Sequence, residues 1–199
     1  MARACAPYAG AIRRAVHRHW GPWRLPQAWM AQLYQESRCD PAAVSPAGAR
    51  GLAQFMPATW AEMARRLDLP AGATPHDAIA IEAGAAYQAR LMRQWDRGRD
   101  FAGRWPLGLA SYNAGLGHIL GAQAHCDDAL LWRDVAPCLA RVTGRHADET
   151  RTYVRRTAHW WRTLGACRPA AAPGSVQTLL GCKAARIAPD HPDDEGAPR

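Results

Sequence analysis

Residues 36–60 read ESRCDPAAVSPAGARGLAQFMPATW. An acidic residue, Glu36, opens this stretch, and a loop rich in Pro, Gly, Ser and Ala follows it. Pro57 is then a residue typical of the first turn of a new helix. We therefore expect Glu36 to close one helix, and the loop after it to fold a polar residue back over the carboxyl group.

The segment before the loop predicts a helix over 26–38 with an interrupted apolar face. Trp29 and Leu33 are four residues apart and Glu36 is seven beyond Trp29, so all three share one side of the helix. Burial against apolar groups raises the pKa of a carboxyl group, which would let Glu36 hold a proton near neutral pH as a general acid. The alternative is a boundary residue whose carboxylate reaches water or an arginine.

Four short motifs follow one another in a recognisable order. They are Glu36-Ser37, then Ser45-Pro46 with Gly51-Leu52-Ala53-Gln54 and Met56-Pro57, then Ser111-Tyr112-Asn113-Ala114-Gly115, and finally Glu149-Thr150-Arg151-Thr152-Tyr153-Val154. Over roughly residues 8–166 this order resembles the soluble lytic transglycosylase family. The departure is Ala53, where that family usually has methionine, and it puts the methionine's contact with sugar in doubt.

The resemblance implies a mainly α fold of the α+β lysozyme-like superfamily, of goose type. We expect a single compact helical domain, residues 1–167, with a catalytic cleft and a short loop or hairpin region. Residues 168–199 are rich in Pro and Ala and end in a run of acidic residues, so we expect a poorly ordered tail there.

The resemblance also implies a reaction, in which Glu36 is the catalytic residue. Glu36 would protonate the glycosidic oxygen between N-acetylmuramic acid and N-acetylglucosamine, and would then take the proton of the C6 hydroxyl as a 1,6-anhydro ring forms. No metal or organic cofactor is implied. The remaining motif residues would bind substrate (Ser45, Gln54, Tyr112, Asn113, Tyr153) or support the site (Glu149, Ser37, Met56).

Two other functions remain open at this point. A goose-type lysozyme would hydrolyse the same bond, although hydrolysis usually needs a second carboxylate and Asp40, the nearest one, matches no catalytic position of the family. A wall-binding or structural module that has lost activity is the second alternative, and Ala53 is the only residue in its favour.

The composition bounds the partners. The 199 residues carry a formal net charge of +8, and Lys183 is the only lysine, so arginine supplies almost all of the positive charge. Such a surface favours a polyanion, which can be nucleic acid, acidic lipid or the cell wall, and charge alone does not choose among the three. The lack of a recognisable nucleic-acid module makes nucleic acid the less favoured partner. The resemblance implies peptidoglycan strands as the partner, without nucleic acid and without stable membrane insertion. We expect a monomer acting on periplasmic peptidoglycan. No signal peptide is recognisable, which favours delivery by a phage or a specialised secretion system.

Six cysteines allow 15 complete pairings. Cys126 and Cys138 bracket a short polar loop and are the best candidates for a disulfide, although buried free thiols would fit the pattern too. No Cys or His cluster has the spacing of a zinc site.

Hydrophobic periodicity and helix-capping residues predict further helices. They are a basic amphipathic helix over 9–19, a helix opened by Pro57, a helix starting at Thr74-Pro75-His76-Asp77, a buried helix over 101–112 closed by Gly115, and a last helix over 146–164.

Overall fold

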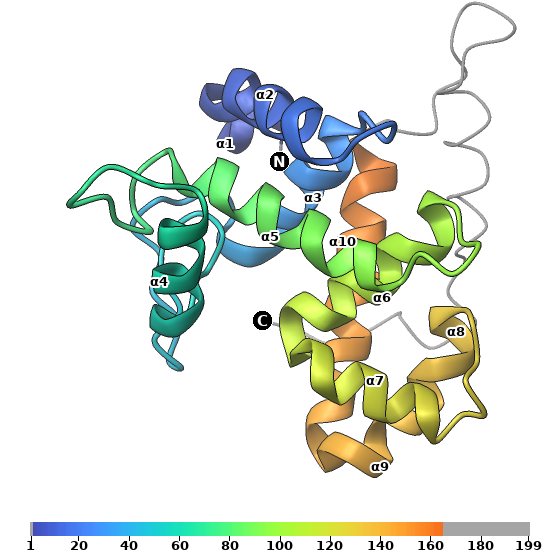
Figure 1. Ribbon diagram of the computed structural model, residues 1–199. Helices are drawn as coiled ribbons and strands as arrows, with labels where there is room; N and C mark the ends of the chain where they lie inside the picture. The colour runs from blue at the N-terminus through green and yellow to red at the C-terminus, as the bar shows by residue number, and fades with distance from the viewer. Residues whose placement is uncertain (1, 165–199) are drawn as a thin grey trace, which may run out of the picture.

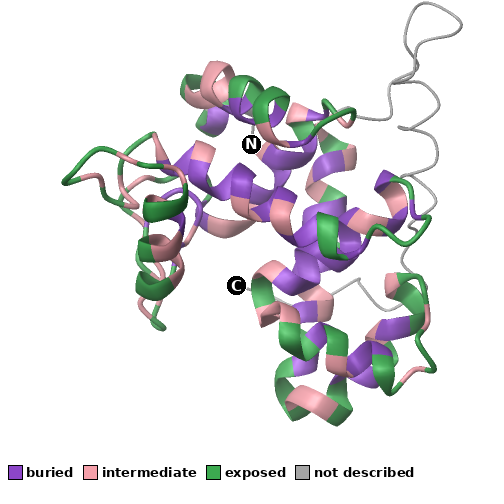
Figure 2. Ribbon diagram, viewed as in Figure 1, coloured by how far each residue is buried: buried purple, intermediate pink, exposed green. Residues whose placement is uncertain are grey.

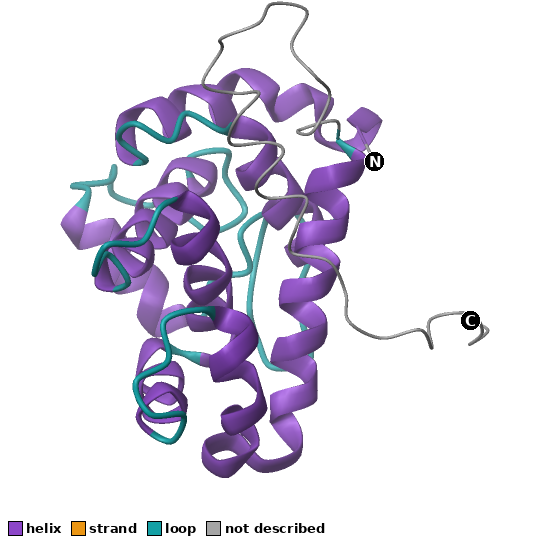
Figure 3. Ribbon diagram, turned by 90° about the vertical axis from the view of Figure 1, so that its right-hand side faces the viewer, coloured by secondary structure: helices purple, strands orange, loops and turns teal. Residues whose placement is uncertain are grey.

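The computed structural model describes residues 2–164, and this part of the chain is a bundle of helices joined by loops (Figure 1). The elements are α1 Ala2–Cys5, η1 Ala6–Tyr8, α2 Ala9–His19, α3 Pro26–Ser37, α4 Pro57–Arg66, α5 Ala80–Gln94, α6 Phe101–Ala114, α7 Leu116–Ala124, α8 Trp132–Val135, η2 Ala136–Leu139, α9 Ala140–Thr143, η3 Gly144–His146 and α10 Ala147–Thr163. The predicted mainly α fold is confirmed. In place of a hairpin, residues 2–164 contain the isolated bridges Val44↔Arg50 and Arg50↔Phe55 and no strand (Figure 3).

Most predicted helices agree with the structure, but the predicted start at Thr74 is wrong. The helix that follows, α5, begins at Ala80. Asp77 explains the difference, because its carboxylate accepts hydrogen bonds from the Thr74 backbone N–H at 2.7 Å and from the Thr74 hydroxyl at 2.9 Å. The capping groups thus stabilise a separate turn rather than the first turn of the helix.

The end of α3 comes before the proline that follows it. Pro41 would stop a helix at the residue before it, yet α3 ends at Ser37 because Arg38 and Cys39 both adopt left-handed backbone conformations, with φ of 57° and 62°. A left-handed residue after the last turn is a common helix terminator, although glycine usually occupies it. The chain therefore turns away immediately after Glu36, earlier than the proline would require.

The core lies between α10 and the helices α3 and α6, and between α5 and the helices α2 and α6 (Figures 1 and 2). Five tryptophans are among its largest fully buried side chains: Trp20, Trp29, Trp95, Trp105 and Trp161. Their large apolar area stabilises the fold through the hydrophobic effect. The cluster also holds α3 rigidly, and α3 carries Glu36.

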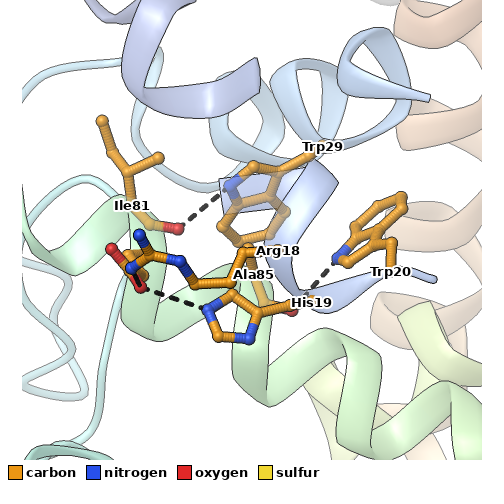
Figure 4. Close-up of polar contacts among 7 residues, drawn as sticks. Arg18, His19, Trp20, Trp29, Ile81 and Ala85 are labelled. Atoms are coloured by element: carbon orange, nitrogen blue, oxygen red, sulfur yellow. Dashed lines mark hydrogen bonds and ion pairs between the residues drawn. The ribbon is translucent and has the colours of Figure 1, made fainter. Parts of the chain in front are cut away.

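Two of these tryptophans connect the N-terminal helices to α5 through hydrogen bonds (Figure 4). Trp20 donates its indole N–H to the carbonyl oxygen of Ala85 at 3.0 Å, and Trp29 donates to that of Ile81 at 3.2 Å. At the surface of the same contact, Glu82 pairs with Arg18 and lies 3.3 Å from His19 Nε2. The direction of α3 is thus fixed by buried bonds as well as by packing.

Two disulfides close loops in the described part of the chain. Cys126 and Cys138 are bonded, which confirms the predicted pair, and Cys5 is bonded to Cys39. The second bond ties the N-terminal segment to the residue three positions after Glu36. The other cysteines, Cys167 and Cys182, and the predicted boundary and tail after 167 lie outside the described residues.

Removing the Cys5–Cys39 bond should destabilise the protein more than removing Cys126–Cys138. The bonds join residues separated by 34 and 12 positions, so the longer loop restricts the unfolded chain more. Loop-closure entropy gives losses of about 4 and about 3 kcal/mol in the free energy of unfolding. Urea unfolding of the two double Cys→Ser variants measures both values. Equal stability of the Cys5/Cys39 variant and the wild type would show that this bond does not form.

No helix within residues 2–164 is long and apolar enough to cross a membrane.

Candidate active site

The side chain of Glu36 lies at the C-terminal end of α3, partly buried against α10. Tyr153 of α10 donates a hydrogen bond from its hydroxyl to Glu36 Oε1. Burial raises the pKa of Glu36 to about 8, and the bond from Tyr153 opposes part of that rise. Glu36 is therefore protonated at neutral pH, as a general acid must be.

Two phenols lie beside this carboxyl group. Burial, and then the nearby Glu36 charge, raise the pKa of Tyr153 and of Tyr112 well above the usual value. Tyr112 of α6 donates its hydroxyl to the carbonyl oxygen of Ala53 at 2.8 Å. Both phenols therefore stay neutral at physiological pH. Tyr153 links α10 to Glu36, and Tyr112 links α6 to the loop that contains Ala53.

Residues 41–56 form a loop that we call the roof. Ser45 Oγ accepts from the Ala49 backbone N–H at 3.0 Å. Gln54 adopts a left-handed backbone, with φ of 46°, and its Nε2 donates to the carbonyl oxygens of Gly51 at 2.9 Å and Ala43 at 3.2 Å. Such strain in a residue other than glycine is typical of functional sites. The side-chain amide holds the roof in shape, and its oxygen and the Ser45 hydroxyl hydrogen are the groups left for a ligand.

The roof is fastened to the rest of the protein from both sides. Ser37 Oγ donates to the carbonyl oxygen of Leu52 at 2.8 Å, so the residue next to Glu36 bonds directly to the roof. On the other side, His76 Nδ1 donates to the carbonyl oxygen of Pro41 at 2.8 Å. These two hydrogen bonds fix the position of the roof relative to α3. The sequence pattern indicated neither bond.

The structure answers the question raised by Ala53. This residue is fully buried, and a Cβ placed on Gly84 of α5 would lie 2.9 Å from the Ala53 Cβ and 2.7 Å from the Trp29 ring. Position 53 therefore faces Gly84 in the core, and the small pair lets the roof approach α5 closely. Met56, at the start of α4, is exposed.

A pocket of about 390 Å³ opens next to Tyr153. Its lining residues are Gln35, Asn113, Asp148, Glu149, Thr152, Tyr153 and Arg156. The resemblance gave Glu149 a supporting role, and in the structure its side chain is exposed at this pocket. A hydrogen bond between α10 and α6 comes from the next residue, Thr150, whose hydroxyl donates to Asn113 Oδ1 at 2.8 Å. Glu149 thus offers a free carboxylate to the pocket.

The structure brings most of the predicted site residues to one region. Tyr153 donates a hydrogen bond directly to Glu36, and Tyr112 lies close enough for the Glu36 charge to raise the pKa of its phenol. Ser37, next to Glu36, bonds to the roof, which also carries Ser45 and Gln54. Asn113 and Glu149 lie farther along, in the pocket. Within residues 2–164 no group of His, Cys, Asp or Glu side chains has the arrangement of a metal site.

The raised pKa of Glu36 makes the stability of the protein depend on pH. Between the unfolded value of 4.5 and the folded value of about 8, the folded protein binds a proton that the unfolded chain has lost, so the free energy of unfolding falls as pH rises. The Glu36→Gln variant lacks this dependence. We expect its stability relative to the wild type to grow by about 3 kcal/mol between pH 4 and pH 9, allowing for partial exposure of the residue. Urea unfolding at both pH values measures the difference, and a constant difference would contradict a raised pKa.

The helical fold, the partly buried Glu36 at the end of α3 and the loop bonded to the next residue are the features expected of a lysozyme-like domain. Residues 22–130 match the family described as the Transglycosylase SLT domain, and the chain belongs to this family. The predicted resemblance is thereby confirmed.

Individual relatives agree with this assignment. The chain is 35% identical over 152 residues to membrane-bound lytic murein transglycosylase F of Desulfosudis oleivorans, covering 72% of this chain and 31% of the relative. It is 31% identical over 139 residues to the soluble lytic murein transglycosylase of Escherichia coli K12, covering 66% of this chain and 19% of the relative. The chain thus spans about a third and about a fifth of the lengths of these relatives.

Solved structures show the same fold. The 70-kDa soluble lytic transglycosylase in complex with bulgecin A aligns with a TM-score of 0.65 at 24% identity, over 89% of this chain and 26% of that one. An inactive mutant of the lytic transglycosylase Slt from Pseudomonas aeruginosa aligns with a TM-score of 0.61 at 25% identity, over 78% of this chain and 23% of that one.

Proposed function

We propose that the protein is a peptidoglycan lytic transglycosylase that cleaves the β-1,4 bond between N-acetylmuramic acid and N-acetylglucosamine without water. The observation that carries the proposal is the partly buried Glu36 carboxyl group, which accepts a hydrogen bond from Tyr153 beside the roof and whose pKa burial raises to about 8. The names of the relatives, which are lytic murein transglycosylases, support the same reaction.

One carboxyl group suffices for this chemistry. Glu36 donates its proton to the glycosidic oxygen as the bond to C1 breaks, and the 2-acetamido group of the muramic sugar stabilises C1. The C6 hydroxyl of the same sugar then attacks C1 and returns its proton to the Glu36 carboxylate, giving a 1,6-anhydro ring. Proton and bond counts balance, and the residue ends in its starting state.

The cause of the Glu36 pKa supports a single acid. In a retaining glycosidase two carboxyl groups stand about 5 Å apart, and their mutual repulsion shifts the pKa of one of them. The pKa of Glu36 is raised by burial and lowered by Tyr153, and no carboxylate contributes. Glu149, in the adjoining pocket, is the carboxylate that a hydrolase would need, and its role is open to direct test.

The other predicted residues take supporting roles in the proposal. The Ser45 hydroxyl and the Gln54 amide oxygen would hydrogen-bond the acetamido group and the sugar from the roof. Asn113, which lines the adjoining pocket, and Tyr112 would bind the sugar from α6. Tyr153 positions Glu36. The roof bonds that involve Ser37 keep these groups at a fixed distance from the acid.

The proposal places the protein at the cell wall as a monomer, delivered by a phage or by a specialised secretion system. The two disulfides support a place of action outside the reducing cytoplasm. The positive net charge of +8 favours association with the carboxylates of the wall peptides.

Mass spectrometry of the fragments released from purified sacculi tests the reaction. A lytic transglycosylase gives muropeptides one water lighter than the corresponding reducing sugars. Ordinary reducing ends would indicate hydrolysis by a goose-type lysozyme. Binding to sacculi without any release of fragments would indicate a wall-binding module and would refute the proposed activity.

A further inference from the structure

An arginine lies two residues after Glu36 and is held in place by two aromatic rings. The guanidinium carbon of Arg38 is 4.7 Å from the centroid of the Tyr34 ring and 5.1 Å from that of the Trp160 ring. The two rings pack edge to face, with their centroids 5.2 Å apart. A guanidinium group is attracted to the face of an aromatic ring, and in that position its N–H edges remain free to donate. We call Tyr34, Arg38 and Trp160 the Arg38 cluster.

The charge of Arg38 has no carboxylate partner within residues 2–164. The residue is exposed, and none of the ion pairs in the described chain includes it. Its backbone is left-handed, with φ of 57°, at a position where glycine is usual because a side chain adds strain. An aligned guanidinium group without a counter-ion is suited to bind an anion from outside the protein.

The Arg38 cluster borders the pocket beside the catalytic acid. Trp160 donates its indole N–H to Gln35 Oε1 at 2.9 Å, and Gln35 lines the pocket. The pocket residues Tyr153 and Arg156 precede Trp160 on α10 by seven and four positions, so all three lie on one face of the helix. The cluster therefore continues the wall of the pocket along α10.

The charge changes sign along this face of α10. Glu149 lies at one end of the pocket wall, and Arg156 follows it by seven residues, about 10 Å along the helix. Asp148, at the same end as Glu149, is paired with Arg151 at 2.7 Å. Within residues 2–164 neither Arg156 nor Arg38 forms an ion pair, so the end of the wall near the Arg38 cluster is positive.

We propose that the Arg38 cluster is a binding site for a carboxylate of the peptide stem that the muramic sugar carries. The peptide is attached to this sugar through its lactyl group, and the proposed reaction places C1 of the sugar at Glu36. The stem therefore leaves the glycan next to the residues that flank Glu36. Arginine binds a carboxylate through two parallel N–H···O bonds, and the two rings hold the plane of the guanidinium group that such binding needs. The inference deepens the proposed function and rests on it, because it adds the peptide to the glycan as part of the substrate.

A soluble N-acetylmuramyl tripeptide tests the proposal in two forms, one with free carboxylates and one with its carboxylates converted to amides. Calorimetric titration of both forms into the wild type and into Arg38→Gln gives four dissociation constants. We expect the wild type to bind the free acid about tenfold more tightly than the amide, as a charge-assisted hydrogen bond provides. Arg38→Gln should remove this preference. An undiminished preference in the variant, or no preference in the wild type, would overturn the proposal.

Two further variants separate a specific site from the general effect of charge. Arg97 is also exposed, in the loop between α5 and α6, so Arg97→Gln removes the same charge elsewhere and should keep the preference for the acid. Tyr34→Leu removes one ring beneath Arg38 and should lower the preference by about threefold, with no further loss in the Arg38→Gln background. Equal losses from Arg97→Gln and Arg38→Gln would show a non-specific effect and refute the site.

Acidic lipid is the competing ligand for such a cation. Binding of the wild type and of Arg38→Gln to phosphatidylglycerol vesicles, measured by co-sedimentation, should be equal within about twofold. If the variant lost vesicle binding and kept its preference for the free acid of the tripeptide, the ligand would be a membrane surface and the proposal would be wrong.

The binding measurements need no turnover, so they are separate from the test of the reaction. An absence of anhydro products from the wild type would refute the proposed function. A tripeptide preference that does not depend on Arg38 would refute the carboxylate site, whichever products the wild type releases.

Discussion

Replacing Glu36 by Gln should lower the release of muropeptides from sacculi by at least about 10³-fold while the protein stays folded. The amide has the shape of the carboxyl group and can still accept the hydrogen bond from Tyr153, but it can neither give a proton to the glycosidic oxygen nor take one from the C6 hydroxyl. Rates from liquid chromatography and a thermal unfolding curve of the same sample give both results. Turnover near the wild-type rate would refute Glu36 as the catalytic acid.

Matched carboxylates provide the controls for this variant. Asp40 is exposed and accepts a hydrogen bond from the Ala42 backbone N–H at 2.8 Å, so Asp40→Asn should keep its activity within about twofold. Glu149→Gln removes the carboxylate in the pocket. A loss as large as that of Glu36→Gln would point to a second catalytic carboxyl group and hence to hydrolysis.

Replacing Gly51 by Ala should displace the roof and reduce both stability and activity. Gly51 has a φ of +73°, and an added Cβ would lie 1.7 Å from the carbonyl oxygen of Pro75, closer than any tolerated contact. The segment that contains Pro75 and the backbone at position 51 must therefore move apart. A shift of the position-51 carbonyl weakens the 2.9 Å hydrogen bond that it accepts from Gln54 Nε2. We expect a loss of about 3 kcal/mol or more in the free energy of unfolding and at least about a tenfold loss of activity.

Gly48 gives a matched control within the same loop. Its φ of +86° is in the same region, but a Cβ there would meet nothing within 4 Å. Gly48→Ala should therefore cost only the backbone strain, about 1 kcal/mol. Equal melting temperatures for the two variants would show that the close approach of the roof to Pro75 is absent in solution.

The sequence predicted what depends on local pattern. The period of apolar residues predicted α2 and α10 closely, and Gly115 predicted where α6 ends. The apolar face with Trp29 and Leu33 predicted the partial burial of Glu36. The wrong start of α5 had a local cause as well, because the capping residue Asp77 also satisfies a turn. The same hydrogen bond between Thr74 and Asp77 can cap a helix or close a separate turn, and the sequence pattern does not distinguish the two structures.

The contacts that complete the site join residues far apart in the chain. Ser37 bonds to the Leu52 carbonyl oxygen, His76 bonds to that of Pro41, and Thr150 bonds to Asn113. No periodic pattern encodes such pairs, since each depends on how loops meet after the helices have packed.

The titration of the Glu36 carboxyl group in the resting protein tests the central claim most directly. With 13C-labelled glutamate, the signal that disappears in Glu36→Gln identifies the residue, and its chemical shift is followed from pH 3 to pH 10. We predict a midpoint near 8, because burial keeps this carboxyl group protonated at neutral pH. A midpoint near the ordinary value of 4.5 would show an ionised, solvated carboxylate and would contradict the account of a single acid that gives and then retrieves a proton.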